Sequence, residues 1–411
     1  MKQKLSALAV CVFLLLAGTG NLAAENALSP WNHSTNPAFF SFGTREYFEL
    51  GLSFDTTVSN SALGLSDVFK SVVVIDLDEV YANTPDDGVR IGANAAAEVH
   101  LALHFGNVSL GIYTDTYNLS RIVIPKSFIG LLTQGNRPDM AYEGSSEILQ
   151  RSFALAGAFA SYQIGGFVFA GKLGVFSPVL YSDENAQAGY TLETAIDGTI
   201  RGEVSASGDI YTAMGEEGFQ GLGFNVSLGM VRPDGEGKPL YGAALNNIPI
   251  LAAQPGYIIE VEQLRYEFEA TDLLDRLEGD LDLFSSTSEI GDIETRPLDP
   301  SDRPKIHMPF SASGFFRFAI PVIDIIPEAE VVFDKPVRWN AGISVEGNVF
   351  PANIFSVGFG RRDYLWYACG GLRVPLRAFE LAVQVASVGT TPLGIFDVTG
   401  LGATVSMAVG Y

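Results

Sequence analysis

The stretch Val89–Phe105 reads VRIGANAAAEVHLALHF, and every odd-numbered position in it is apolar. The even-numbered positions include Arg90, Glu98, His100 and His104. Globular strands are usually about 5–6 residues long, whereas a tilted strand needs about 9–11 residues to cross a hydrocarbon core. We therefore predict a membrane-spanning strand whose odd-numbered side chains, from Val89 onward, face lipid and whose charged even-numbered side chains face a wet lumen. A long hairpin in a soluble sandwich would alternate in the same way.

The same alternation returns along the rest of the chain. It covers residues 48–55, then 167–175 after a Gly165-Gly166 turn, then 222–230, and later 379–385. Adjacent alternating strands joined by short glycine turns form a meander. Because the pattern spans the whole mature chain, we predict one all-β domain, a single transmembrane antiparallel up-and-down barrel. The further side chains expected on its lumen side are Lys172 and Asn225.

The composition agrees with a membrane protein that has no membrane-spanning helix. The chain of 411 residues is 47% hydrophobic and 18% charged. Beyond its first residues, no apolar run reaches the roughly 18–20 residues of a spanning helix. In hydrocarbon every backbone N–H and C=O group must be satisfied internally, so a closed barrel is the remaining solution. The net charge of −22 argues against a nucleic-acid partner, since binding phosphates requires clustered Lys and Arg.

The two ends of the chain predict export to the bacterial outer membrane. Residues 1–24 combine a basic start, an apolar run from Leu5 to Leu16 and a small-residue end at Ala23-Ala24, which is typical of a cleaved signal peptide. The last strand, Leu401–Tyr411, ends on an aromatic residue, as outer-membrane barrels commonly do, and barrel-assembly machinery reads that end. Removal of the signal leaves Cys369 as the only thiol, so no intrachain disulfide is possible.

One long acidic segment, from about residue 267 to 304, does not fit a barrel wall. Within it, residues 271–284 place apolar side chains at helical spacing, with Asp272 and Asp275 in the first turn. We predict a short amphipathic helix inside a long extracellular loop, because the periplasmic turns of such barrels are short. A second short helix is predicted near residues 66–70.

Four short motifs carry a resemblance to a known family. They are Asn36-Pro37-Ala38-Phe39, Gly171-Lys172-Leu173-Gly174, Gly221-Leu222-Gly223-Phe224-Asn225 and Gly242-Ala243-Ala244-Leu245-Asn246-Asn247. The first resembles the Asn-Pro-Ala segment in the N-terminal plug of the outer-membrane long-chain fatty-acid transporters, the FadL-like superfamily. In their order and spacing, the four together look like a branch of that superfamily in diderm bacteria.

The resemblance implies a barrel of about fourteen strands, formed by residues 45–411, with residues 25–44 tucked into its lumen as a plug. It also implies uptake of small hydrophobic solutes, such as fatty acids, past a plug that moves. Residues 25–44 show no sustained alternation, which agrees with a place inside the barrel rather than in its wall. The expected plug residues are Trp31, Asn36, Pro37, Ala38, Phe39 and Phe40.

The sequence predicts no catalytic or metal site. His100 and His104 share a strand face, but at about 3.3 Å per residue they are roughly 13 Å apart, too far to bind one metal ion together. Glu98 with His100 could supply two ligands or an acid–base pair if a neighbouring strand brought a third group. No linear motif supplies the Ser/His/Asn or Asp/His grouping of outer-membrane phospholipases and proteases. We therefore expect neither an enzyme nor a bound cofactor.

The function predicted on these grounds is uptake of small hydrophobic solutes through an outer-membrane barrel. Apolar plug residues such as Trp31, Phe39 and Phe40 suit such a substrate, although they would equally pack a plug against the wall. The alternative is a structural, adhesin-like or secretion-associated barrel without transport, which the long acidic loop favours. The expected partners are outer-membrane lipid, the solute and the barrel-assembly machinery, and the barrel is expected to be a monomer.

Overall fold

The computed structural model describes most of the chain beyond residue 34. The described residues are 35–42, 47–61, 81–82, 84–86, 88–134, 140–182, 186–194, 200–215, 218–270, 288–289, 293–335, 337–350, 353–363, 365–376, 378–396 and 398–411. The predicted signal peptide, Trp31 and the two helices predicted at 66–70 and 271–284 lie outside them. Among the described residues, no helix is long and apolar enough to span a membrane.

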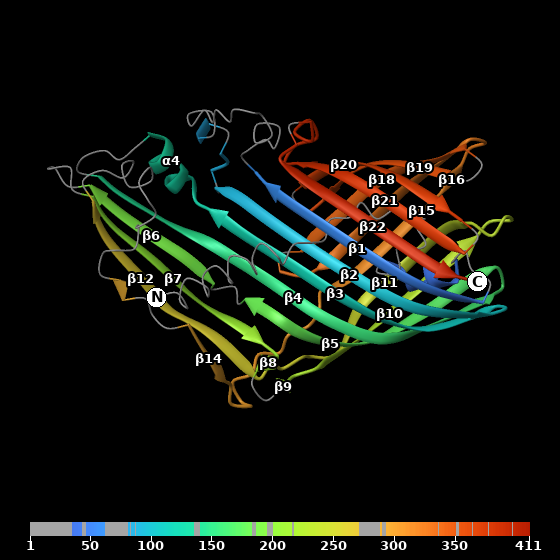
Figure 1. Ribbon diagram of the computed structural model, residues 1–411, viewed down its shortest axis with the longest axis horizontal. Helices are drawn as coiled ribbons and strands as arrows, with labels where there is room; N and C mark the ends of the chain where they lie inside the picture. Colours follow the sequence, from blue (N-terminus) through green and yellow to red (C-terminus); the bar gives the residue numbers. More distant parts are fainter. Residues whose placement is uncertain are drawn as a thin grey trace.

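Fourteen of the described strands form one closed antiparallel ring, so the predicted barrel is confirmed (Figure 1). Each strand pairs with the next, and β22 pairs with β1 to close the ring. In order around the wall they are β1 (Phe48–Asn60), β2 (Val89–Phe105), β3 (Val108–Ile124), β4 (Met140–Ile164), β5 (Phe167–Ser182), β10 (Gly223–Pro233), β11 (Pro239–Leu251), β15 (Phe310–Phe316), β17 (Ile323–Phe333), β18 (Arg338–Phe350), β19 (Asn353–Arg362), β20 (Leu365–Pro375), β21 (Phe379–Gly389) and β22 (Gly400–Gly410).

The two faces of the wall follow the alternation of the sequence. On β2, Leu101 and Leu103 are exposed on the outer surface, whereas Glu98 and His100 are buried inside. Val89 departs from this pattern, since it is only 6% exposed. It is the first residue of β2 and pairs with Ile124, just before the chain turns into the helix α4 (Lys126–Gln134). The prediction that Val89 faces lipid is therefore wrong, because the end of the strand is covered by protein.

The two ends of the barrel have connections of different length. Tight turns at residues 106–107 and 165–166 lie at the same end as Tyr411 (Figure 1). Gly165 and Gly166 have φ angles of +61° and +79°, a backbone conformation that suits glycine in a two-residue hairpin turn. The longest connections lie at the opposite end, for example between β1 and β2 and between β11 and β15, although β19 and β20 are joined there by a short turn. Since periplasmic turns are short in outer-membrane barrels, the short-turn end is the periplasmic one.

A second group of strands extends the wall at the long-loop end, where Figure 1 shows β6, β7 and β12 beside α4. The first half of β4 pairs with β6 (Gln187–Thr194), β6 with β7 (Ile200–Thr212), and β7 with β12 (Tyr257–Ala270). The acidic segment predicted from about residue 267 therefore begins within β12. The smaller strands are β8 (Met214–Gly215), β9 (Gly218–Phe219), β13 (Ser288–Glu289), β14 (Ile293–Pro297) and β16 (Phe318–Ala319).

A short 3-10 helix, η1 (Pro37–Ser41), packs against β10, β5, β4 and β3. Pro37 stands at its first position, where the missing N–H costs nothing, and the Asn36 side chain caps it by accepting from the Ala38 N–H. Asn36 and Pro37–Phe40 are all buried. This segment is not a strand of the ring, so what holds it in place is a matter of side-chain contacts.

Candidate functional site: the lumen and segment 35–42

One end of the buried segment is held by hydrogen bonds to the wall. The Asn36 side chain donates through Nδ2 to the backbone carbonyls of Met230 on β10 and Ala243 on β11, both at 3.3 Å. Gly229 of β10 is the wall residue that Asn36 approaches closely. A side chain would not fit there, because a Cβ atom on Gly229 would lie 2.1 Å from Asn36 Oδ1. Two further wall side chains, Asn246 and Ser313, donate to the Thr35 carbonyl, at 2.8 and 2.9 Å.

The middle of the segment is held by apolar packing. Ala38 and Phe39 are at most 1% exposed and pack with Val168 and Val231 of the wall. The Phe39 ring lies 5.4 Å from the ring of Phe315 on β15. Burial of one aromatic side chain contributes about 1.5–3 kcal/mol, so these contacts fix the segment across the lumen from β5 to β15.

The other end is held by an aromatic stack beside charged groups. The Phe40 ring lies flat on the Phe159 ring of β4, with centroids 3.5 Å apart and planes 5° from parallel. His100 of β2 approaches the same ring edge-on at 5.3 Å. The Lys172 ammonium of β5 lies 5.6 Å from its centroid. Ser41 then forms a hydrogen bond with Ser161.

The six side chains predicted to face the lumen have different surroundings. Glu98, His100, Lys172 and Asn225 are each at most 7% exposed. His104 is half-buried, with Nδ1 2.9 Å from the Ser109 hydroxyl, and Arg90 is half-buried at the long-loop end of β2. Glu98, His100 and Lys172 come together in one cluster. Asn225 lies elsewhere, donating to Asn247 Oδ1 and Met308 Sδ.

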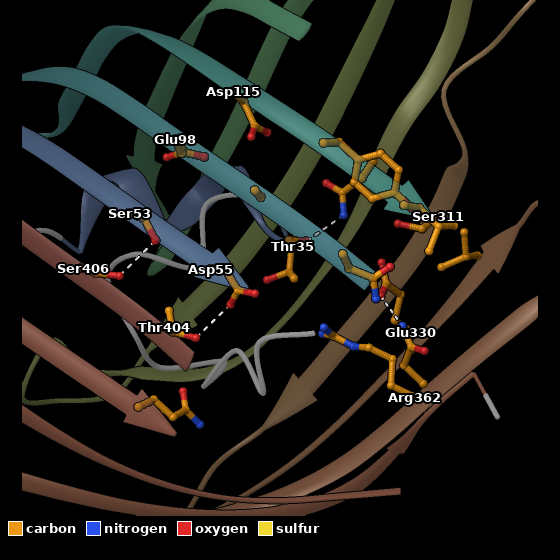
Figure 2. Close-up of a pocket in the computed structure, with 18 of the residues that line it drawn as sticks. Thr35, Ser53, Asp55, Glu98, Asp115, Ser311, Glu330, Arg362, Thr404 and Ser406 are labelled. Carbon is orange, nitrogen blue, oxygen red and sulfur yellow. Dashed lines mark hydrogen bonds between the residues drawn. The ribbon is translucent and has the colours of Figure 1, made fainter. Parts of the chain in front are cut away.

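A cavity of about 300 Å³ occupies the lumen on the extracellular side of Thr35. Figure 2 shows its polar walls, with Asp55, Glu98 and Asp115 on one side and Ser311, Glu330 and Arg362 on the other. The three acids stand on the adjacent strands β1, β2 and β3, and Glu98 is the direct cross-strand neighbour of Asp115. Thr404 of β22 donates to Asp55 at 2.8 Å. This part of the lining is therefore polar, whereas the lining as a whole combines polar and apolar side chains.

One sector of the cavity is apolar. Leu155 of β4 and Met308 line it, together with Tyr117. They belong to a buried cluster that also contains Phe153, Phe176, Ala253 and Ile306. Ala253 and Ile306 exchange backbone hydrogen bonds at 2.8 and 2.9 Å, so these two residues are joined where both pack against Phe153 and Leu155 of the wall. This sector is where an apolar group of a ligand would find apolar contacts.

Several lumen residues were not singled out from the sequence. Glu49 lies beside His100, and Arg338, Glu346, Arg362 and Arg373 line the cavity from β18 to β20. The signal that could have found Arg338 and Glu346 is present, because the even-numbered residues of 338–346 alternate with Trp339, Ala341, Ile343 and Val345. Among the described residues, no group of three or more His, Cys, Asp and Glu side chains has metal-binding geometry.

Comparisons with known proteins give a likeness in fold. No protein-family model and no curated protein sequence matches the chain. Among solved structures, the toluene transporter TbuX of Ralstonia pickettii is 9% identical, with 97% of each chain covered and a TM-score of 0.47. The monoaromatic hydrocarbon channel CymD is 10% identical over 97% of each chain, with a TM-score of 0.47. A FadL homologue of Pseudomonas aeruginosa is 10% identical over 95% of each chain, with a TM-score of 0.44. At these identities the similarity is one of fold and does not extend to the solute.

The outer surface identifies the surroundings of the barrel. Large apolar side chains are exposed along the wall, including Leu50, Phe54 and Leu173. Exposed aromatic side chains gather near both ends of this band, Tyr47, Phe105, Tyr162 and Tyr411 at the short-turn end and Phe333 and Trp339 at the other. An apolar band with aromatic side chains at its ends is what lipid and its interfaces favour on a closed barrel. The protein is a transmembrane β-barrel of the bacterial outer membrane.

Proposed function

We propose that this protein is a plugged channel for the uptake of small hydrophobic solutes, such as fatty acids, across the outer membrane. The observation that carries the proposal is segment 35–42, which lies inside the ring with Ala38, Phe39 and Phe40 at most 2% exposed. Passage along the lumen requires this segment to move. It is attached through side chains and is not part of the wall's ladder, so it can move without opening the barrel.

The cavity beyond the segment supports the choice of solute in one sector. Leu155, Met308 and Tyr117 offer apolar contacts to the body of a small solute. Part of the charge on the remaining walls is already neutralised by ion pairs, such as Arg121 with Asp363 at 2.7 Å. A fatty acid would place its chain in the apolar sector and its carboxylate toward the arginines of β18–β20.

Two adjacent residues allow a matched test of the solute. Met308 lines the apolar sector, whereas His307 beside it is exposed. In cells that lack the native protein, Met308→Gln should lower uptake of a labelled fatty acid, and His307→Gln should leave it at the level of the unchanged protein. Mass spectrometry of the barrel purified in mild detergent should identify a bound apolar solute. Equal uptake with and without the protein, and no copurified solute, would overturn the proposal.

A barrel that binds a partner at the cell surface is the second candidate. The strands β6, β7 and β12, which extend the wall at the long-loop end, favour it because they add surface that a channel does not need. Under this alternative, removing residues 271–287 should abolish binding to cells or matrix and leave solute uptake unchanged.

A further inference from the structure

Five charged side chains at the long-loop end of the barrel form a chain of alternating charge. Arg121 Nη2 lies 2.7 Å from Asp363 Oδ2, and Arg338 Nη2 lies 3.3 Å from Asp334 Oδ2. The same Asp334 oxygen accepts a hydrogen bond from Arg151. Arg338 also interacts with Asp363, which joins the two groups. In order, this charge chain is Arg121, Asp363, Arg338, Asp334 and Arg151.

The charge chain crosses the lumen. Arg121 and Arg151 stand on the adjacent strands β3 and β4, whereas Asp334 directly follows β17 and Asp363 directly follows β19. Around the ring, β5, β10, β11 and β15 lie between β4 and β17. In the other direction, β2, β1, β22, β21 and β20 lie between β3 and β19. The paired groups therefore come from opposite sides of the wall and not from neighbouring strands.

The charge chain lies at the extracellular edge of the cavity. Arg121, Arg338 and Asp363 line the cavity near the extracellular ends of β3, β18 and β19. Thr35 lines the same cavity next to the buried segment. A solute that moves inward along the lumen therefore meets these charges before it reaches segment 35–42.

Local structure holds both carboxylates in place. Asp363 has a φ angle of +55°, a left-handed conformation that Asp and Asn adopt more readily than most residues, and its N–H donates to Asn340 Oδ1 at 3.1 Å. Asp334 Oδ1 accepts from the Lys335 N–H at 2.8 Å, while its Oδ2 accepts from the two arginines. Each of two turns on one side of the wall thus presents an acid to the arginines of the other side.

The ion pairs of the charge chain are of a kind that can separate. The side chains of Asp334 and Asp363 are 15% and 26% exposed. Ion pairs that remain in contact with water contribute little to stability, although a network contributes more than a single pair. Only side chains take part, so separation of the pairs leaves the backbone hydrogen bonds of the wall unbroken.

We propose that the charge chain is the selective entrance of the lumen and sets the size of the solutes that reach the cavity from outside. While the ion pairs are closed, their side chains divide the lumen, and only slender solutes pass between them. Bulkier uncharged solutes pass when the pairs separate. This inference rests on the proposed function in that it takes the lumen as the route of the solute.

The test measures access to the cavity in the full chain. Ala96→Cys in a Cys369→Ser background places a thiol in the cavity lining, and Ser301→Cys places one on the exposed surface. Each thiol is labelled with N-ethylmaleimide and with a bulkier uncharged maleimide. The rate for the bulky reagent is divided by the rate for the small one, which cancels the ionisation of the thiol. The value for Ala96→Cys relative to that for Ser301→Cys is the access quotient.

The access quotient should lie well below one in the chain with its charges unchanged, and a value near one overturns the entrance. Asp334→Asn combined with Asp363→Asn removes both negative charges and keeps both turns, because Asn also accepts an N–H and suits the left-handed conformation. The access quotient should then rise by about tenfold, since two partly exposed ion pairs in a network contribute on the order of that factor.

Asp324→Asn is the matched control for this double variant. Asp324 is 24% exposed and pairs with Arg317 at 3.2 Å, but this ion pair joins neighbouring parts of the wall and does not cross the lumen. The control should leave the access quotient unchanged. An equal rise in the control and the double variant, or no rise in the double variant, overturns the entrance.

Ionic strength gives a second readout, with opposite signs in the two proteins. Salt screens attraction, so the access quotient of the unchanged charge chain should rise by about twofold from about 0.1 M to about 1 M NaCl. In the double variant the remaining guanidinium groups repel one another, so the quotient should fall over the same range. A barrel that is merely loosened would change in the same direction with and without the two acids, and that result would overturn the assignment.

The labelling needs no solute, so the two proposals can fail separately. A low access quotient that rises in the double variant, in a protein without solute uptake, would support the entrance and contradict the transport proposal. Solute uptake with an access quotient near one would support transport and overturn the entrance.

Discussion

The two ends of segment 35–42 are held by different kinds of interaction. At the Asn36 end, neutral hydrogen bonds run between an amide and the wall carbonyls of Met230 and Ala243. At the Phe40 end, one aromatic ring rests on Phe159 and on a cluster of charges. The first kind is directional, whereas the second is ring stacking beside charged side chains. The comparison shows that one short segment can combine directional hydrogen bonds at one end with ring stacking at the other.

Removing the segment should have the largest effect. Deletion of residues 35–41 takes away both ends while the ladder hydrogen bonds of the ring remain, so the barrel should fold and become a leaky pore. Conductance in planar bilayers should rise well above that of the full chain. Unchanged conductance in a folded barrel would show that another part of the molecule closes the lumen.

Phe40→Ala should weaken the contacts at the Phe40 end of the segment. Truncating a buried Phe typically costs about 3–5 kcal/mol. Here the loss weakens docking of segment 35–42 and leaves the wall intact. The population of molecules with the segment undocked, the open form, should therefore rise by roughly a hundredfold or more. The measurement is the rate at which a water-soluble maleimide labels Ser41→Cys in a Cys369→Ser background, divided by the rate for Asn107→Cys in an exposed turn. This quotient is the labelling ratio. Phe42→Ala is the matched control, because Phe42 is half-buried and lies 6.2 Å from Phe39. Similar effects of both substitutions would contradict a special role for the Phe40 contacts.

Asn36→Ala should weaken the contacts at the Asn36 end with a smaller effect. It removes the hydrogen bonds to the wall and the cap on Ala38, together worth about 1–3 kcal/mol, so the open form should rise by roughly tenfold to a hundredfold. The stack of Phe40 on Phe159 should stay intact in this variant. An effect larger than that of Phe40→Ala would contradict this order of the two ends.

The smallest effect is expected at a site far from both ends, the turn after β10. Burial opposes ionisation of Asp234, but the backbone N–H groups of Lys238 and Glu236 and the Arg317 guanidinium lower its pKa below the ordinary 3.8. Asp234 therefore stabilises the fold above about pH 4, and this contribution is lost as pH falls through the lowered value. Asp234→Asn should lower the melting temperature at pH 7, with the difference shrinking on acidification, and leave the labelling ratio unchanged.

Much of the wall could be predicted from sequence, because lipid outside and water inside impose a period of two on every strand. Val345 and Glu346, or Leu101 and Glu98, take their faces from this rule alone. Val89 does not follow this rule, because its neighbour at the strand end is protein rather than lipid. The extension of the wall by β6, β7 and β12 could not be predicted from this rule either, since pairing between distant segments leaves no local periodicity.

The sequence by itself determined the class of the molecule, a barrel with an apolar outer face, a polar lumen and a non-alternating segment near residue 36. It did so because the solvent on each face of the wall favours an apolar or a polar side chain at each residue separately. Only the tertiary structure decided that Glu49, Glu98, His100 and Lys172 meet beneath Phe40, although up to 123 residues separate Glu49 from Lys172 in the chain. The arrangement of the strands around the ring brings each of these charges within 4 Å of the next, and no local pattern encodes the register between strands that are distant in sequence.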